Sequence, residues 1–385
     1  MLLRTLQVRG HGPRRSYRCV GVCGQTLTSR KKACLAALRI VKKAPEHAET
    51  FLEKLENPFA EKNHGALMCS VELIIACLKT EARTVFLPKH RLHVGAAVRL
   101  LKQLVLASKT SDYDVNGIMD PFLQVKILQF LRVCGDGSGV ASEAMNDVLA
   151  QVITNTDGTK NTGTAVHYEC VKTILAIEAD PSLRTLAINT LGKFLTSTKD
   201  NNIRFVALAQ LLHVNEKDAG TVQKHNPIII DCLKDGDVSI RRRALELTVA
   251  LIDASNVRIL VPDLISYLSA CDDEVKEEVA KQMCLVIQRK YPSASWYVEM
   301  AMRIFKVGKQ FTPEEFALNF VAIVSQSSTE VQLTAMHLIW DTVSNHRFEL
   351  PNVLVQNESN GWVEPAAYFR GSRTLHATAA LLWAA

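Results

Sequence analysis

The sequence has 385 residues and is 48% hydrophobic, which is enough to bury a large core, and it contains only 18 Gly and 12 Pro. This composition favours helices over a turn-dense β fold. Charged residues make up 22% of the chain and both signs are mixed along it, which excludes global disorder.

The formal net charge of +6 is unevenly distributed, because residues 1–45 hold eleven Lys and Arg and no Asp or Glu. The rest of the chain therefore carries a formal net charge of −5, which argues against a general nucleic-acid-binding surface. The ten cysteines lie in a long chain and mostly in apolar patterns, so we expect a reducing compartment rather than a disulfide framework. No apolar run approaches the ~20 residues that span a bilayer.

The two ends of the chain differ from its middle. Residues 1–27 are Arg-rich and acid-free, a composition that fits a mitochondrial transit peptide, an unstructured extension or an artefactual start of the sequence. We expect three parts: an atypical basic segment at 1–27, a helical array at 28–345 and an atypical tail at 346–385. Cys19 and Cys23 could form half of a metal site, but no second pair follows at ligand spacing, so we expect no metal.

Apolar stripes with helical spacing begin near residue 33 and recur along the array. One stripe runs through Ala33, Ala37, Ile40, Val41 and Ala44. Similar stripes fall within 127–134, 187–195 and 240–251, and no strand-like alternation of comparable length competes with them. The middle of the chain is therefore predicted to be a succession of helices.

A repeated pattern accompanies the stripes. Branched or aliphatic residues precede a base at Arg204, Arg241 and Lys276, which are separated by 37 and 35 residues. Asp200 and Asp237 lie near the predicted helix starts, where an acidic residue favours the positive end of the helix dipole. This sequence pattern is typical of HEAT or armadillo repeats. The predicted fold class is therefore all-α, an α-α superhelix of stacked helix pairs.

Polar stretches mark the predicted connections. Residues 108–119 are polar and non-periodic, and Pro121 is placed to begin the next helix. A second polar stretch covers 135–142, with a helix predicted to start at Ser142. Residues 63–65 and 235–237 are predicted to be short linkers.

Several ordered, collinear segments resemble the trunk of gamma-adaptins. They are Asp112–Val125, Ser142–Val152, Ala187–Leu195, Asn202–Leu208 and Asp231–Ile240. The resemblance runs from about Arg30 to about Lys306, with a fainter continuation to Val343. The family's early trunk, hinge and ear find no match in this sequence, so we expect a partial trunk in which the family's phosphoinositide and dileucine-cargo contacts cannot be placed.

The resemblance implies a non-enzymatic large subunit of the type-one clathrin adaptor complex. It implies beta, mu and sigma adaptins as partners, recruitment by an Arf-family GTPase, and indirect links to clathrin and cargo tails. It also implies a cytoplasmic location, peripheral on trans-Golgi and endosomal membranes. Two alternatives stay open: a generic HEAT-repeat scaffold in nuclear transport or signalling, and a truncated adaptin fragment without function.

Two runs of bases are the candidate contact residues for an acidic partner or a lipid headgroup. The first is Arg241, Arg242 and Arg243 at a predicted helix start, and the second is Arg30, Lys31 and Lys32. Successive residues point around a helix, so neither run is expected to form one patch, and a solvated repeat face with an inter-repeat ion pair is the simpler interpretation.

Other conspicuous residues are interpreted structurally. His90 and His93 are expected on a solvated helix edge, the glycines of 135–139 in a flexible loop, and Trp296 in inter-helix packing. The sequence shows no catalytic motif of the kinds that characterise hydrolases or zinc proteases. We therefore expect no enzymatic activity and no cofactor.

Overall fold

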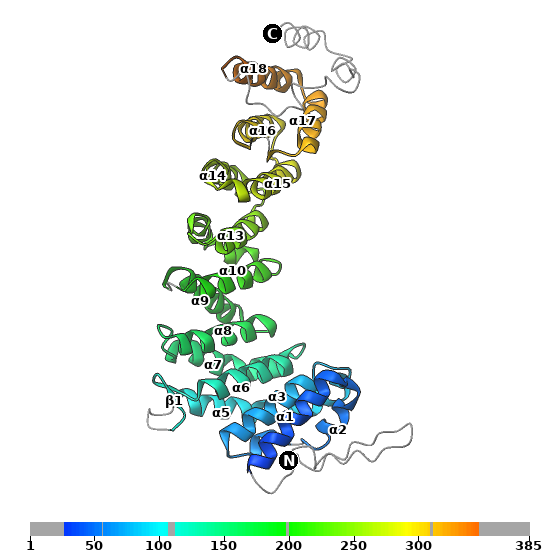
Figure 1. Ribbon diagram of the computed structural model, residues 1–385, viewed down its shortest axis with the longest axis vertical. Coiled ribbons are helices and arrows are strands. Elements are labelled where there is room, and N and C mark those ends of the chain that lie inside the picture. Colours follow the sequence, from blue (N-terminus) through cyan, green and yellow to red (C-terminus); the bar gives the residue numbers. More distant parts are fainter. Residues whose placement is uncertain (1–26, 56, 107–111, 198–199, 309–310, 346–385) are drawn as a thin grey trace. The chain divides into compact units, whose positions relative to one another are not determined.

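The structure is a computed structural model that describes residues 27–55, 57–106, 112–197, 200–308 and 311–345. The described residues are almost entirely helical, which confirms the all-α prediction (Figure 1). The chain divides into two compact units, residues 1–199 and 200–385. Of the predicted end segments 1–27 and 346–385, all residues except Leu27, which begins α1, lie outside the described residues, and so do Cys19 and Cys23.

The first unit consists of short and long helices with one small β-hairpin. Its elements are α1 (Leu27–Lys43), η1 (Pro45–His47), α2 (Ala48–Leu52), η2 (Pro58–Ala60), α3 (His64–Cys77), α4 (Arg83–Arg91), α5 (Val94–Leu106), β1 (Asp114–Val115), β2 (Ile118–Met119), α6 (Pro121–Gly135), α7 (Gly139–Asn155), α8 (Asn161–Ala176) and α9 (Pro181–Ser197). Helices α1, α3, α6 and α8 pack side by side in that order as one layer. Helices α5, α7 and α9 form the second layer, so the unit is a stack of helix pairs.

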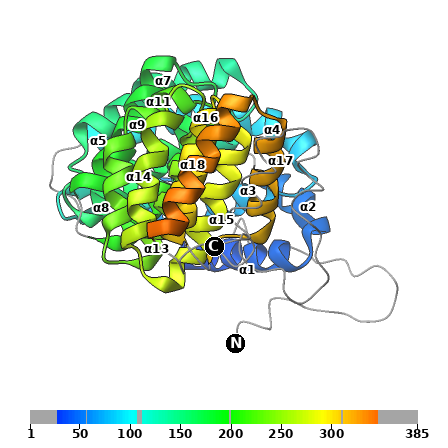
Figure 2. The ribbon, with the colours of Figure 1, turned by 90° about the horizontal axis from the view of Figure 1, so that it is seen from above.

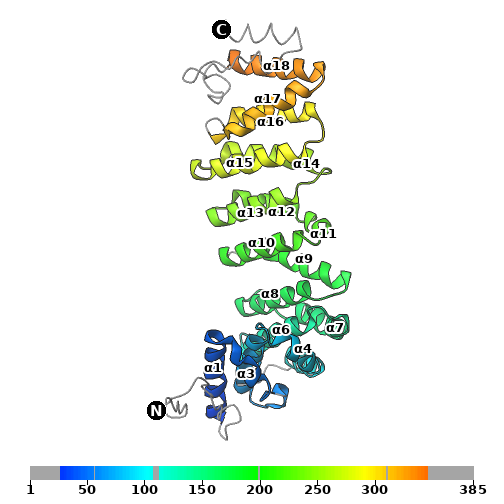
Figure 3. The same cartoon turned by 90° about the vertical axis from the view of Figure 1, so that its right-hand side faces the viewer.

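The second unit continues the same design. Its elements are α10 (Asn201–Asn215), α11 (Ala219–Gln223), α12 (Asn226–Asp231), η3 (Cys232–Lys234), α13 (Val238–Leu251), α14 (Val257–Ala270), α15 (Asp273–Lys290), α16 (Ala294–Gly308), α17 (Glu314–Gln326) and α18 (Thr329–Asn345). Helices α10, α13 and α15 stack in one layer (Figure 3). Helices α14, α16 and α18 stack in the other (Figure 2).

The core of each unit lies between the two layers and is built from the predicted stripes. In α6, Ile127, Phe130, Leu131 and Cys134 are all fully buried. Trp296 is buried at 9% exposure, as the packing interpretation predicts. Because a single helix pair cannot bury both of its apolar faces, each pair depends on the next one for stability.

Helix starts follow the polar residues that the sequence marks, with shifts of a few residues. Asp200 and Asp237 are N-caps, and the Asp237 carboxylate accepts a hydrogen bond from the Ser239 amide at 2.8 Å. The prediction for α7 is wrong by three residues, because Ser138 is its N-cap and Gly139 its first residue. His64 and Gly65, predicted as a linker, belong to the first turn of α3, since Asn63 caps that helix.

The connection between α5 and α6 contains a hairpin that apolar periodicity does not reveal. Strands β1 and β2 pair antiparallel around Asn116 and Gly117, which have φ angles of 55° and 82°. Asn-Gly is the sequence that favours a two-residue turn with both residues in the left-handed region. The signal was therefore present in the sequence, within a stretch interpreted only as a polar linker.

Candidate interaction surfaces

The three arginines of α13 begin one turn after the Asp237 cap, and their side chains have three different partners. Arg241 is 13% exposed and its guanidinium lies 2.7 Å from the carboxylate of Asp272. It also donates to the carbonyl oxygens of Asp235 and Gly236, at 3.0 and 3.3 Å. Arg241 thus connects the turn before its own helix to the turn before α15.

Arg242 and Arg243 point elsewhere. Arg242 is half-exposed and lies 3.5 Å from Glu278 of α15. Arg243 pairs with Glu246 of its own helix at 2.6 Å, and its guanidinium lies over the Phe205 ring, 5.1 Å from the ring centroid. As the spacing predicts, the run does not form one patch.

The Arg241–Asp272 contact has a counterpart one repeat earlier. Arg204 of α10 pairs with Asp235, and both pairs join residues that are 31 positions apart. Asp235 also accepts a hydrogen bond from the Asp237 amide at 3.0 Å, which fixes the turn before α13. Two of the three bases that define the sequence repeat, Arg204 and Arg241, therefore join consecutive repeats, whereas Lys276 pairs with Asp273 of its own helix at 2.9 Å.

The cations of α1 are also dispersed. Arg30 pairs with Glu61 at 3.3 Å. The Lys31 amino group packs over Gly65, where a Cβ atom would lie only 2.6 Å from it. Lys32 is exposed and makes no ion pair with any residue that the structure describes. Of these three bases, Lys32 is the one that faces solvent freely.

A buried histidine replaces the predicted solvated edge on α4. His90 is 2% exposed, so the prediction of a solvated His pair is wrong for this residue. Burial, together with the nearby positive charges of His93 and Lys89, lowers the pKa of His90 to about 4. The helix turns its His90 face into the unit because Phe86 and Leu87 are buried beside it.

The glycine-rich stretch 135–139 ends α6 at Gly135, forms a tight turn at 136–138 and begins α7 at Gly139. Gly137 has a φ of 68°, which favours glycine. Arg83 of α4 donates to the Asp136 carboxylate at 2.7 Å, and Arg91 donates to the Cys134 and Asp136 carbonyls. The predicted flexible loop is thus a turn held by two arginines.

A further cluster joins α3, the hairpin and α6. The Nδ1 atom of His64 lies 2.8 Å from a carboxylate oxygen of Asp120, and its ring stacks on Tyr113 with centroids 4.7 Å apart. Asp120 also caps α6 by accepting from the Leu123 amide at 3.0 Å. Lys160, the N-cap residue of α8, donates to the Asn116 carbonyl at 2.9 Å, which connects the tip of the hairpin to the N-terminus of α8. This cluster positions the hairpin.

The described ranges contain no group of three or more His, Cys, Asp or Glu residues arranged to hold a metal ion. Within the same ranges, none of the helices is both long and apolar enough to cross a membrane. Burial raises the pKa of the Cys77, Cys134 and Cys284 thiols to about 12. These thiols are packing residues that stay protonated at neutral pH.

Two layers of stacked helix pairs, tied by ion pairs between repeats, define the class of α-helical repeat scaffolds. The chain belongs to the adaptin N terminal region family, whose model matches residues 27–356. It is 46% identical over 297 residues to the AP-1 complex subunit gamma-1 of Mycosarcoma maydis, and 41% identical over 298 residues to the AP-1 complex subunit gamma of Dictyostelium discoideum. Each match covers 77% of this chain and 33% of the relative, so the chain spans about a third of these relatives.

The human AP-1 complex subunit gamma-like 2 is 34% identical over 327 residues, covering 85% of this chain and 41% of the relative. Among structures, a chain of a homology model of the full-length AP-3 complex in an intermediate open conformation superimposes with a TM-score of 0.55 at 17% identity. That match covers 87% of this chain and 60% of the other, and it supports the helical-repeat fold. The resemblance to gamma-adaptins is thereby confirmed.

Proposed function

We propose that this chain acts as part of the gamma subunit of an AP-1-type clathrin adaptor complex, without enzymatic activity, in vesicle-mediated transport between the trans-Golgi and endosomes. The observation that carries the proposal is the 46% identity to an AP-1 complex subunit gamma-1 over 77% of the chain. The relatives' names place them in a multi-subunit complex. A stack of helix pairs suits this role, because it offers extended surfaces to partner subunits.

The partners proposed are beta, mu and sigma adaptins, with an Arf-family GTPase as the recruiting factor on the cytoplasmic face of the membrane. Affinity purification of the tagged chain from its source cell tests this. Recovery of beta, mu and sigma adaptins is expected, and recovery of none of them would contradict the proposal. Recovery of importin cargo or a phosphatase core without coat subunits would favour the generic HEAT scaffold instead.

Among the six predicted contact bases, we propose Lys32 and Arg242, each in its own unit, as contacts for an acidic partner or lipid headgroup. Both are exposed, although Arg242 also lies 3.5 Å from Glu278, whereas Arg30, Lys31, Arg241 and Arg243 are only partly exposed. The test compares Lys32→Glu and Arg242→Glu with Lys217→Glu, an exposed lysine outside both runs. Coat-subunit recovery and sedimentation with phosphatidylserine vesicles should fall for either of the first two variants and not for the third. Equal behaviour of all three variants would contradict the proposal.

A further inference from the structure

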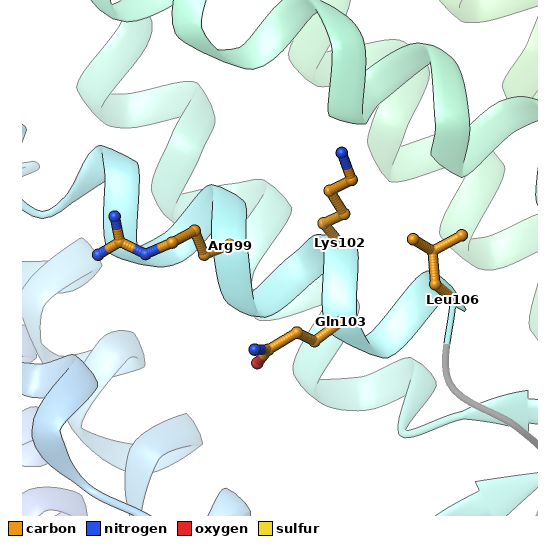
Figure 4. A pocket seen from close by; sticks show the side chains of 4 residues that line it. All are labelled: Arg99, Lys102, Gln103 and Leu106. Carbon is orange, nitrogen blue, oxygen red and sulfur yellow. The ribbon is translucent and has the colours of Figure 1, made fainter.

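Helix α5 has one face in the core and one face that is exposed in the part of the chain that the structure describes. Val94, Ala97, Leu101 and Leu104 are buried and pack the helix into the first unit. On the outer side, Arg99, Lys102, Gln103 and Leu106 line a shallow recess of about 440 Å³ (Figure 4). All four side chains come from α5, and Lys102 and Leu106 extend to the same side of the helix.

The recess is cationic. Arg99 and Lys102 are exposed and form no ion pair with any residue that the structure describes, unlike Arg83 and Arg132 of the same unit. None of the described residues that line the recess is acidic. Leu106, at its end, is 59% exposed, so an aliphatic surface adjoins the two charges.

The spacing of these residues forms one stripe. Arg99, Lys102 and Leu106 stand at i, i+3 and i+7 on α5, so they extend for about 10 Å along the helix axis. A second helix laid along this stripe would meet it with residues three and four apart, because such residues share a face.

The surface also favours a helix over an extended strand as its ligand. The backbone amides and carbonyls within α5 are bonded along the helix and cannot pair with an extended peptide. A strand pressed on this surface would lose water from its own backbone groups without gaining partners. A helix satisfies its own backbone, so only its side chains must match the recess.

We propose that the outer face of α5, formed by Arg99, Lys102, Gln103 and Leu106, docks an acidic helix of another protein. The carboxylates of that helix pair with Arg99 and Lys102, and an aliphatic residue covers Leu106. The proposal does not depend on the function proposed above, since it rests on the charge and exposure of α5 alone.

The test uses the full 385-residue chain and a fluorescent alanine-based peptide of about 20 residues, a length at which an isolated helix becomes stable. The peptide carries Glu at positions three and four apart on one face, with one Leu on that face. A matched peptide has Gln in place of every Glu. Fluorescence anisotropy at low ionic strength measures the dissociation constants, because screening weakens exposed pairs at high salt.

The expected result is that Arg99→Glu/Lys102→Glu weakens binding of the Glu peptide about tenfold or more, because two attractive pairs become repulsive. Leu106→Ser should weaken it about fivefold through lost apolar contact. The Gln peptide should bind weakly to every variant. Circular dichroism should show that the variants keep the helical content of the parent chain.

The matched control is Arg39→Glu/Lys43→Glu on α1, which makes the same change of charge at two exposed bases. If this control loses as much affinity as the α5 variant, binding is a general response to positive charge and the proposal fails. A photoreactive version of the Glu peptide gives an independent readout. Cross-links within residues 94–106 support the docking site, and cross-links mainly on α1 overturn it.

Discussion

The guanidinium of Arg241 lies 2.7 Å from the carboxylate of Asp272, and this contact joins α13 to the turn that begins α15. The residues are 31 positions apart, as are Arg204 and Asp235 in the repeat before. A helix-start base therefore serves as the connection between consecutive repeats. Arg241 also donates to the carbonyl oxygens of Asp235 and Gly236 in the turn before α13, which adds to this connection.

The connecting role predicts unequal costs for two neighbouring arginines. Arg241→Ala should lower the free energy of unfolding of the second unit by about 1 kcal/mol, since hydrogen bonds from a partly buried guanidinium are lost. Arg242→Ala should change it by less than about 0.5 kcal/mol, because its ion pair is exposed. Urea denaturation of both variants measures the difference, and equal losses would contradict the connecting role of Arg241.

Two glycines should respond to alanine with opposite signs. Gly117 has a φ of 82°, so Gly117→Ala should destabilise the first unit by about 1 kcal/mol. Gly95 lies in the first turn of α5, with no atom within 4 Å of an added Cβ, so Gly95→Ala should stabilise it by about 0.5 kcal/mol. Thermal melts of the two variants test this pair, and a gain for Gly117→Ala would show that the turn is not as described.

His90 should make the first unit sensitive to mild acid. Its pKa is about 4 in the folded chain, against about 6.5 for an unperturbed histidine, so the unfolded chain binds a proton first as the pH falls. The contribution of neutral His90 to the free energy of unfolding is therefore fully present above pH 6.5. It is lost progressively as the pH falls, and at pH 4 the loss is about 3 kcal/mol. His90→Leu should remove this part of the pH dependence.

Urea midpoints at several pH values between 7.5 and 4 compare His90→Leu with the parent chain. His213→Gln is the matched control, because the His213 side chain is 66% exposed. Because His90 and His213 lie in different units, a second measurement should report on the first unit alone. Hydrogen exchange of the α4 backbone amides serves this purpose. An unchanged pH profile in His90→Leu would show that another group is responsible.

Three buried thiols should resist alkylation until the chain unfolds. The pKa values of Cys77, Cys134 and Cys284 are raised to about 12 by burial, so the reactive thiolate is scarce at pH 8. Iodoacetamide followed by mass spectrometry should find these cysteines unmodified in the folded chain and modified in urea. Rapid labelling of Cys134 under native conditions would indicate that the α6 helix opens locally.

The sequence by itself determined the fold class and the repeat. The stripe of Ile127, Phe130, Leu131 and Cys134 has helical spacing, and such a stripe is buried whenever helices stack. Asp200 and Asp237 marked two helix starts correctly, because capping depends on the residues next to the helix. Local signals of this kind do not require knowledge of the rest of the fold.

Only the tertiary structure decided which side chains are free. Adjacent arginines look equivalent in the sequence, yet the Arg241 side chain is 13% exposed in its contact with Asp272, whereas Arg242 is 50% exposed beside Glu278. His90 and His93 look alike, but packing of α4 buries the first. Likewise, only the structure shows that Arg99 and Lys102 line one recess and form no ion pair with the residues that it describes. Exposure and ion pairing are set by residues tens of positions away, and for that reason spacing along one helix cannot predict them.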